Sequence, residues 1–384
     1  MTAKEIVSWM GAIQAQDYSM AKWAIGIRLP DSTDELIAAA INEGEILRTH
    51  LMRPTWHFVS SDDIYWMLEL TAPHIIASMK FREKWLGLTG AIIAKSNRVI
   101  EKALSPDEHL TREELIAELN KARIVTGGFR GSHLIMRAEW EGLICSGRMK
   151  GIKQTYALLE KRVAKRKHVS REDSLKELAR KYFSSHGPAT LHDFARWSGL
   201  SMNDSKNALE MIKSKFVSEV ADGNTYWLPD SLAVPNHESI PNAPSRIGAL
   251  RDMPLSPSLF GKRGGKPALR DGGESEYCWQ HLRKQNSVFL LPAFDEFLVG
   301  YKDRSASLYR SIEKKLISEN RLFRPAIVIN GQVTGLWKRK IADGELIIET
   351  GLFRAHTKKE KDVIRQASMQ FGKFLDAKNV VCRI

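Results

Sequence analysis

Apolar residues near the start of the chain recur at helical spacing, and an alternating pattern follows them. Ile6, Val7, Met10 and Ile13 predict one apolar face of a helix over residues 3–13. A second helix is expected after Ser32-Thr33, and strands are expected over residues 46–52 and 55–59, where β-branched and aromatic residues gather. These elements form one small module of helices and a strand pair.

A similar order of elements recurs twice further along the chain. In the second copy, Thr111 and Glu114 have the spacing of a capping box, which predicts a helix to about residue 122. Another helix over 132–143 precedes a basic loop over 147–151. The third copy predicts helices over 171–185, 190–197 and 201–213, then strands over 216–220 and 225–228 around Asp222-Gly223-Asn224. Three helices followed by a hairpin are typical of a winged helix.

The remaining segments differ in pattern. Residues 61–103 predict mostly helix, and we expect their aromatic residues to lie in the core: Tyr65, Trp66, Phe81 and Trp85. Residues 229–287 are rich in proline and glycine and predict a long irregular connection. In the last part, Asn330-Gly331 and Asp343-Gly344 predict hairpins, and a helix is expected over 358–375 before a short strand at 380–381.

These patterns predict an α+β protein with three tandem winged-helix modules and a C-terminal α+β unit. The domain boundaries that we expect are 1–108 for the first winged helix with its helical insert, 109–168 for the second with a basic linker, 169–230 for the third, 231–286 for the irregular connection, and 287–384 for the C-terminal unit with exposed hairpins.

Composition and charge narrow the function. The 384 residues carry a net charge of +13, which favours a polyanionic partner, most simply nucleic acid, although a high isoelectric point also keeps a protein soluble. No apolar run approaches the ~20 residues that span a bilayer, and the N-terminus lacks the apolar segment of a signal peptide. The three cysteines are scattered, which suits a reducing compartment. We expect a cytoplasmic protein without a membrane partner, cofactor or metal.

Two amides near the start offer the most specific chemistry. Residues i and i+2 point apart on a helix but share a face in extended chain, so Gln14 and Gln16 are expected to act together where the first helix runs into a strand. An alternative is that they cap the end of that helix. Asp17 is a candidate carboxylate or a turn residue. His57, on the strand over 55–59, is a candidate catalytic residue or a buried structural histidine.

Several stretches of the chain resemble the tandem winged-helix proteins of the AlkZ/YcaQ type. The resemblance rests on residues 14–18 (QAQDY), 47–50 (LRTH), 53–57 (RPTWH) and 291–297 (LPAFDEF). Members with an assigned activity are DNA glycosylases that remove bulky alkylated purines and in some cases unhook crosslinks. The resemblance implies a β-rich C-terminal part, a C shape around a concave DNA-binding face, and a catalytic centre lined by Gln14 and Gln16. Another branch of the family carries Gln-x-Asp.

The cationic and polar residues that we expect to contact DNA lie in four segments. They are Arg53 and Thr55, then Arg148, Lys150 and Lys153, then Lys161, Arg162, Lys165 and Arg166, and finally Lys338, Arg339 and Lys340. Lysine and arginine neutralise phosphates without reading sequence. Other readings are a solvated linker over 161–168 and a charge-protected edge strand over 336–340. We expect Asp295 and Glu296 to form salt bridges with Lys302 or Arg304.

Two functions therefore remain open. The first is a monomeric, monofunctional DNA glycosylase that acts on bulky N3- or N7-alkylated purines in double-stranded DNA, with the glutamine pair positioning the water. Crosslinks are a further candidate substrate of this enzyme. The second is a non-catalytic winged-helix DNA-binding protein or transcriptional regulator, which should prefer one sequence and bind as a dimer. Sequence motifs of zinc proteases, α/β-hydrolases and zinc deaminases are absent.

Overall fold

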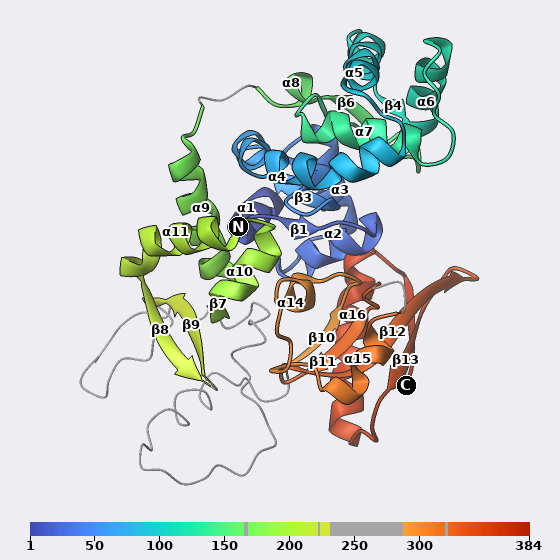
Figure 1. Cartoon of the computed structure of the whole chain (residues 1–384). Coiled ribbons are helices and arrows are strands. Elements are labelled where there is room, and N and C mark those ends of the chain that lie inside the picture. The colour runs from blue at the N-terminus through green and yellow to red at the C-terminus, as the bar shows by residue number, and fades with distance from the viewer. Residues whose placement is uncertain (165–167, 222, 231–286, 319–321) are drawn as a thin grey trace. The chain divides into compact units, whose positions relative to one another are not determined.

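A computed structural model describes residues 1–164, 168–221, 223–230, 287–318 and 322–384 (Figure 1). Contacts between Cα atoms divide the chain into two compact units. The first contains Met1–Gln16, Ala38–Lys181 and Trp197–Ala208, and the second contains Asp17–Ile37, Tyr182–Arg196 and Leu209–Ile384. Within the described residues, no helix is both long and apolar enough to cross a membrane. The predicted connection over 231–286 lies outside the described residues.

The first sheet is built from the N-terminal residues. Its elements are α1 (Ala3–Met10), β1 (Ile13–Gln14), α2 (Tyr18–Gly26), α3 (Asp34–Glu43), β2 (Ile46–Leu51) and β3 (Thr55–Ser60). A capping box between Thr2 and Glu5 starts α1, and its apolar face of Ile6, Val7 and Met10 is buried as predicted. The strands are antiparallel in the order β1-β3-β2, so the two-residue β1 pairs with the edge of β3 that lies away from β2.

The second sheet follows two long helices. The elements are α4 (Ile64–Trp85), α5 (Gly90–Leu104), β4 (Leu110–Thr111), α6 (Arg112–Lys121), α7 (Arg130–Trp140), β5 (Ile144–Ser146), β6 (Thr155–Leu158) and α8 (Leu159–Arg162). The predicted capping box at Thr111 is present, and the sheet order is β4-β6-β5. Leu115, Leu134 and Ile144 belong to one buried cluster that joins α6, α7 and β5.

One prediction for the helical insert is wrong in part. Trp66 is buried, but the side chains of Phe81 and Trp85 are 82% and 68% exposed. Both residues lie in the last turns of α4, opposite the side of Glu83, which is buried. Aromatic composition alone predicted burial, whereas their phase on the helix places them toward solvent.

The third sheet repeats the strand order of the first two. Its elements are α9 (Arg171–His186), β7 (Ala189–Thr190), α10 (Leu191–Ser198), α11 (Met202–Ile212), the 3-10 helix η1 (Lys213–Lys215), β8 (Phe216–Ala221) and β9 (Asn224–Pro229). The order is β7-β9-β8. In each of the three sheets, the first strand in sequence therefore pairs with the last one, which occupies the centre.

A five-stranded sheet forms the C-terminal part. Its elements are β10 (Val288–Leu291), α14 (Glu296–Val299), α15 (Arg310–Leu316), β11 (Ala326–Ile329), β12 (Gln332–Ala342), β13 (Glu345–Leu352), α16 (Lys358–Phe374) and β14 (Asn379–Arg383). The order is β10-β11-β12-β13-β14, with only the β13–β14 pair parallel. Both predicted hairpin turns are confirmed, since Asn330-Gly331 (φ 49° and 78°) and Asp343-Gly344 (φ 52° and 78°) adopt positive φ. Phe371 of α16 packs edge-on against Trp337, with ring centroids 5.0 Å apart.

A buried ion pair ties α2 to this C-terminal part within the second unit. The guanidinium of Arg28 donates two hydrogen bonds to the carboxylate of Asp295, at 2.8 and 2.7 Å, and both residues are at most 5% exposed. Burial acts to lower the pKa of Arg28, but attraction to Asp295 outweighs it and raises that pKa. The expected partner of Asp295 was therefore wrong. Glu296 lies 3.7 Å from the imidazole of His186, and the Arg304 side chain donates to the Leu298 carbonyl.

Breaking this pair from the arginine side should destabilise the second unit. Arg28→Met is expected to lower the free energy of unfolding by about 3–5 kcal/mol, because the carboxylate of Asp295 stays buried without its counterion. Guanidinium chloride unfolding followed by tryptophan fluorescence measures this loss. The matched control is Lys373→Met, whose ion pair with Asp31 is exposed on both sides and should be silent. An unchanged midpoint for Arg28→Met would contradict the assignment.

Candidate functional site

The short strand β1 brings Gln14 beside His57. The two residues face each other in the antiparallel register, so their side chains lie on the same face of the sheet. The Ala15 N–H donates to the Trp56 carbonyl at 2.7 Å and extends this pairing by one residue. The Gln-Ala-Gln segment and the histidine-bearing strand therefore lie side by side. The strand-pair face with Gln14 and His57 also carries Thr49 of β2, which lies opposite His57.

The two side-chain amides are oriented by donors. The Trp56 N–H donates to Oε1 of Gln16 at 3.0 Å, and Nη2 of Arg53 donates to Oε1 of Gln14 at 3.3 Å. Neither donor can accept a hydrogen bond, so each contact identifies the amide oxygen and places the NH2 group on its other side. Helix α1 ends earlier, with Gly11 as its C-cap residue, so the pair lies beyond the helix rather than capping it.

Arg48 holds the backbone between the two glutamines. Its Nε donates to the Ala15 carbonyl at 2.9 Å, and its Nη2 lies 3.5 Å from the Gln16 carbonyl oxygen. Its Nη1 donates to Oε1 of Gln154, and the guanidinium lies 4.1 Å from the centroid of the Trp56 ring. Arg48 is only 7% exposed. The side chain therefore acts as a clamp that fixes the Gln-Ala-Gln segment from the face opposite His57.

His50 and Glu139 continue this buried support. Nδ1 of His50 lies 2.7 Å from the Glu139 carboxylate, which is fully buried. The imidazole packs against Trp56, with ring centroids 3.9 Å apart and the ring planes tilted by 40°. The ring centroids of Trp56 and Tyr156 lie 6.3 Å apart. Burial raises the pKa of the Tyr156 hydroxyl to about 12. Arg48 and His50 were not among the predicted site residues. Their i, i+2 spacing on a predicted strand was the available signal, because it places both on one face.

The other two catalytic candidates adopt structural positions. Asp17 belongs to the second unit and is the N-cap residue of α2, where its carboxylate accepts from the Met20 N–H at 3.1 Å. His57 is fully buried, and its Nδ1 lies 2.9 Å from the Thr55 carbonyl oxygen. These contacts favour the turn and structural interpretations of the two residues. Their catalytic roles stay predictions.

The predicted DNA-contacting residues differ in exposure. Those with exposed side chains are Arg148, Lys150, Lys153, Lys161, Lys338 and Lys340, whereas Arg53, Thr55, Arg162 and Arg339 are partly buried. Arg162 donates to the carbonyls of Ile41 and Asn42, each at 2.8 Å, and so closes the end of α3. Arg339 donates to the Ser19 hydroxyl at 2.7 Å. Lys165 and Arg166 lie outside the described residues.

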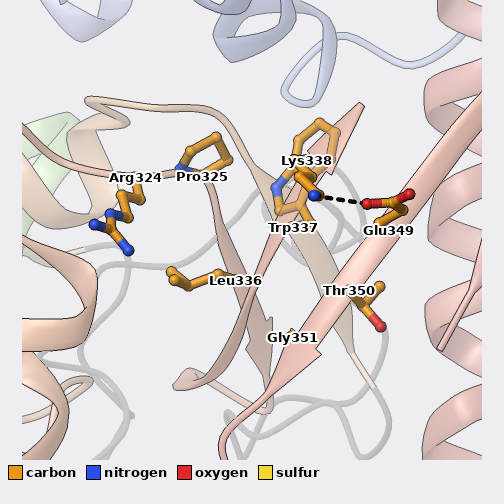
Figure 2. A pocket seen from close by; sticks show the side chains of 8 residues that line it. All are labelled: Arg324, Pro325, Leu336, Trp337, Lys338, Glu349, Thr350 and Gly351. Atoms are coloured by element: carbon orange, nitrogen blue, oxygen red, sulfur yellow. Dashed lines mark ion pairs between the residues drawn. The ribbon is translucent and has the colours of Figure 1, made fainter. Parts of the chain in front are cut away.

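A pocket on the C-terminal sheet contains one of these cations. It has a volume of about 470 Å³ and is lined by Arg324, Pro325, Leu336, Trp337, Lys338, Glu349, Thr350 and Gly351 (Figure 2). Lys338 on β12 forms an ion pair of 2.8 Å with Glu349 on β13, directly across the two strands. The pair lowers the pKa of the Glu349 carboxyl through hydrogen bonding and attraction to Lys338. The pocket belongs to the second unit, and neither Gln14 nor Gln16 lines it.

Comparison with known proteins identifies the family. The sequence matches the family model described as DNA glycosylase AlkZ-like over residues 7–251 and 266–374, so the chain belongs to the AlkZ-like DNA glycosylase family. It is 24% identical over 360 residues to an interstrand DNA cross-link repair glycosylase of Streptomyces sahachiroi, covering 90% of this chain and 84% of that protein. The solved structure of Streptomyces sahachiroi DNA glycosylase AlkZ is similar with a TM-score of 0.71 and 18% identity, over 100% of this chain and 94% of that one. The structural likeness establishes a shared mixed α+β fold.

Removing the clamp should loosen the Gln-Ala-Gln segment. Arg48→Lys keeps the charge but cannot reach all of its partners, so a loss of about 1.5–3 kcal/mol of unfolding free energy is expected. Hydrogen exchange of the Ala15 amide should accelerate, because its bond to Trp56 depends on that segment staying in place. Arg98→Lys, an exposed position on α5, serves as the control. If Arg48→Lys exchanges and unfolds like the wild type, Arg48 is not the clamp.

Proposed function

We propose that the protein is a monofunctional DNA glycosylase that hydrolyses the N-glycosidic bond of bulky N3- or N7-alkylated purines in double-stranded DNA. Crosslinks through such purines would be unhooked by the same step. The observation that carries the proposal is the rigid mounting of Gln14-Ala15-Gln16 against β3 by Arg48 and Trp56, in a chain of the AlkZ-like family. A segment mounted in this way suits catalysis by positioning, in which small displacements are costly.

The proposed chemistry asks little of acids or bases. An alkylated purine already carries positive charge, so it leaves readily, and the enzyme mainly has to place water on the oxocarbenium-like sugar. An amide can both donate to and accept from one water, and glutamine does not titrate in the ordinary pH range. Since Oε1 of Gln16 accepts from the Trp56 N–H, the NH2 group of Gln16 is the contact that this side chain would offer to water. Asp17 would stabilise the cation or act as base. His57 is fully buried and faces Gln14, so its part would be to orient the water rather than to contact a phosphate.

The modular organisation fits a DNA-binding scaffold. We infer that the three sheets with the shared first-third-second strand order are the cores of three tandem winged-helix modules, with the boundaries 1–108, 109–168 and 169–230, and that 287–384 completes a C-shaped molecule around a concave DNA-binding face. The exposed cations of the second module and of the β12–β13 hairpin would contact phosphates. The protein would act as a monomer, because a single lesion offers no two-fold symmetry.

The glutamine pair can be tested directly by single-turnover excision of an N7-alkylguanine from duplex DNA. Gln14→Ala and Gln16→Ala should each lower the excision rate by about 10²-fold, because the water loses one of its two positioning contacts. Gln370→Ala, an exposed glutamine on α16, is the matched control and should react like the wild type.

Two outcomes would contradict parts of this proposal. If the wild type releases no base from any alkylated duplex, the glycosylase function fails, and a sequence-preferring, dimeric regulator becomes the better reading. Full activity of both glutamine variants would leave the function standing and remove the site assignment.

The β12–β13 hairpin should contribute salt-dependent affinity without sequence preference. Lys338→Gln combined with Lys340→Gln is expected to weaken duplex binding and to lower the slope of log affinity against log salt by about 1.8, since each phosphate contact contributes about 0.9. Fluorescence anisotropy at several salt concentrations measures the slope. Lys358→Gln with Lys359→Gln, at the exposed start of α16, is the matched control. An unchanged slope would exclude these lysines from the DNA interface.

A further inference from the structure

An exposed aromatic surface lies at the end of α4, away from the glutamine pair in sequence and unused by the proposed chemistry. Phe81 and Trp85 are 82% and 68% exposed, and Val125 and Phe129, before α7, are 67% and 62% exposed. Most exposed apolar residues of a soluble protein are scattered singly, and a cluster of large ones marks a binding surface. We call these four residues, together with Lys80, Arg82 and Lys84, the α4 surface.

The cations and the aromatic rings form parallel rows. Phe81 and Trp85 are four residues apart, so they stack along one helix face with a rise of about 6 Å. Lys80 and Lys84 have the same spacing and form the adjacent row, and both are exposed. On the other side of the aromatic row, the guanidinium of Arg82 lies 5.5 Å from the Phe129 ring centroid.

The backbone of the surface is held in place by hydrogen bonds from Arg130. Nε of Arg130 donates to the Val125 carbonyl at 2.9 Å, and its Nη1 donates to the Leu86 carbonyl at the end of α4. Beneath the rows, Glu83 is buried and pairs with Arg137 at 2.7 Å. The aromatic side chains therefore project from a fixed backbone, which lowers the entropy lost when a ligand binds.

The charge of the α4 surface selects an anionic ligand. Residues 77–90 contain Lys80, Arg82 and Lys84 with one acid, the buried and paired Glu83. Residues 121–130 contain Arg123 and Arg130 with no acid, whereas Lys121 pairs with Glu118 at 2.6 Å. Cations near a helix C-terminus are ordinary, because they complement the helix dipole. That explanation leaves the two exposed aromatic rings beside them without a role.

We propose that the α4 surface binds single-stranded DNA, with bases stacked on Phe81 and Trp85 and phosphates contacting Lys80 and Lys84. Parallel aromatic and cationic rows match a strand whose bases lie on one side and whose phosphates lie on the other. A duplex hides the faces of its bases, so the exposed rings favour unpaired strands. This activity is independent of base excision and would hold the protein at DNA with an unpaired stretch.

The test compares a fluorescein-labelled 20-residue oligo(dT) with a blunt 20-base-pair duplex by anisotropy, using the full chain. Phe81→Ser combined with Trp85→Ser should weaken oligo(dT) binding at least tenfold, since a stacked base is worth that much, and should leave duplex binding unchanged. Lys80→Gln combined with Lys84→Gln should lower the salt slope for oligo(dT) by about 1.4. Met369→Ser, an exposed apolar residue on α16, is the control.

Photocrosslinking gives a readout on the wild type that does not depend on the folding of a variant. An oligomer containing 5-bromouracil should crosslink to Trp85 or Phe81, as located by mass spectrometry of the digest. Crosslinks confined to other segments, or unchanged oligo(dT) affinity in the serine variant, would overturn the proposal. A wild-type dimer that the serine variant dissociates would overturn it as well, in favour of self-association. Loss of duplex and oligo(dT) binding by the same factor would refute the preference for single strands.

Discussion

The candidate site depends on the pairing of a two-residue strand with the centre of the first sheet. A strand of that length has almost no stability of its own, so β1 stays in place only because other groups hold it. The backbone of Trp56 makes two of these bonds: its carbonyl accepts from the Ala15 N–H, and its N–H donates to the side-chain oxygen of Gln16. The register also decides which chemistry faces which way. A slip of one residue would turn Gln14 away from His57 and expose Ile13 in its place.

This pairing draws its support from the second sheet as well as the first. The Arg48 side chain donates to Gln154, and the backbone N–H of Arg48 donates to the Ser146 hydroxyl at 2.8 Å. His50 contacts the buried carboxylate of Glu139 on α7. Glu139 is fully buried and the side chains of Ser146 and Gln154 are partly buried, so these polar groups depend on their partners in the network. The second sheet and α7 therefore contribute to the site by completing the polar network beneath Trp56. A change in their core would reach the glutamine pair through these bonds.

Local signals in the sequence predicted most elements, and long-range partners escaped them. The capping box at Thr111 and the Asn330-Gly331 turn were predictable because the interacting groups are neighbours in the chain. The partner of Asp295 was not, because Arg28 lies 267 residues away and a nearer cation offered an equally good charge. Likewise, nothing in the spacing of Arg48 indicates that its guanidinium binds the Ala15 carbonyl. The exposure of Trp85 could not be predicted from its aromatic character alone, because its position around the helix axis decides whether the side chain faces solvent.

The bond from the Trp56 N–H to Oε1 of Gln16 has a consequence for how this site can diversify. A carboxylate at position 16 would still present an oxygen to that N–H, so the mounting of the side chain survives the exchange. The outward NH2 group, however, would become a second oxygen, and a pH-independent donor would turn into a titratable acceptor. Glutamine and glutamate at position 16 differ by one heavy atom, and the Trp56 N–H can donate to the side-chain oxygen of either. One scaffold can thus host two kinds of chemistry.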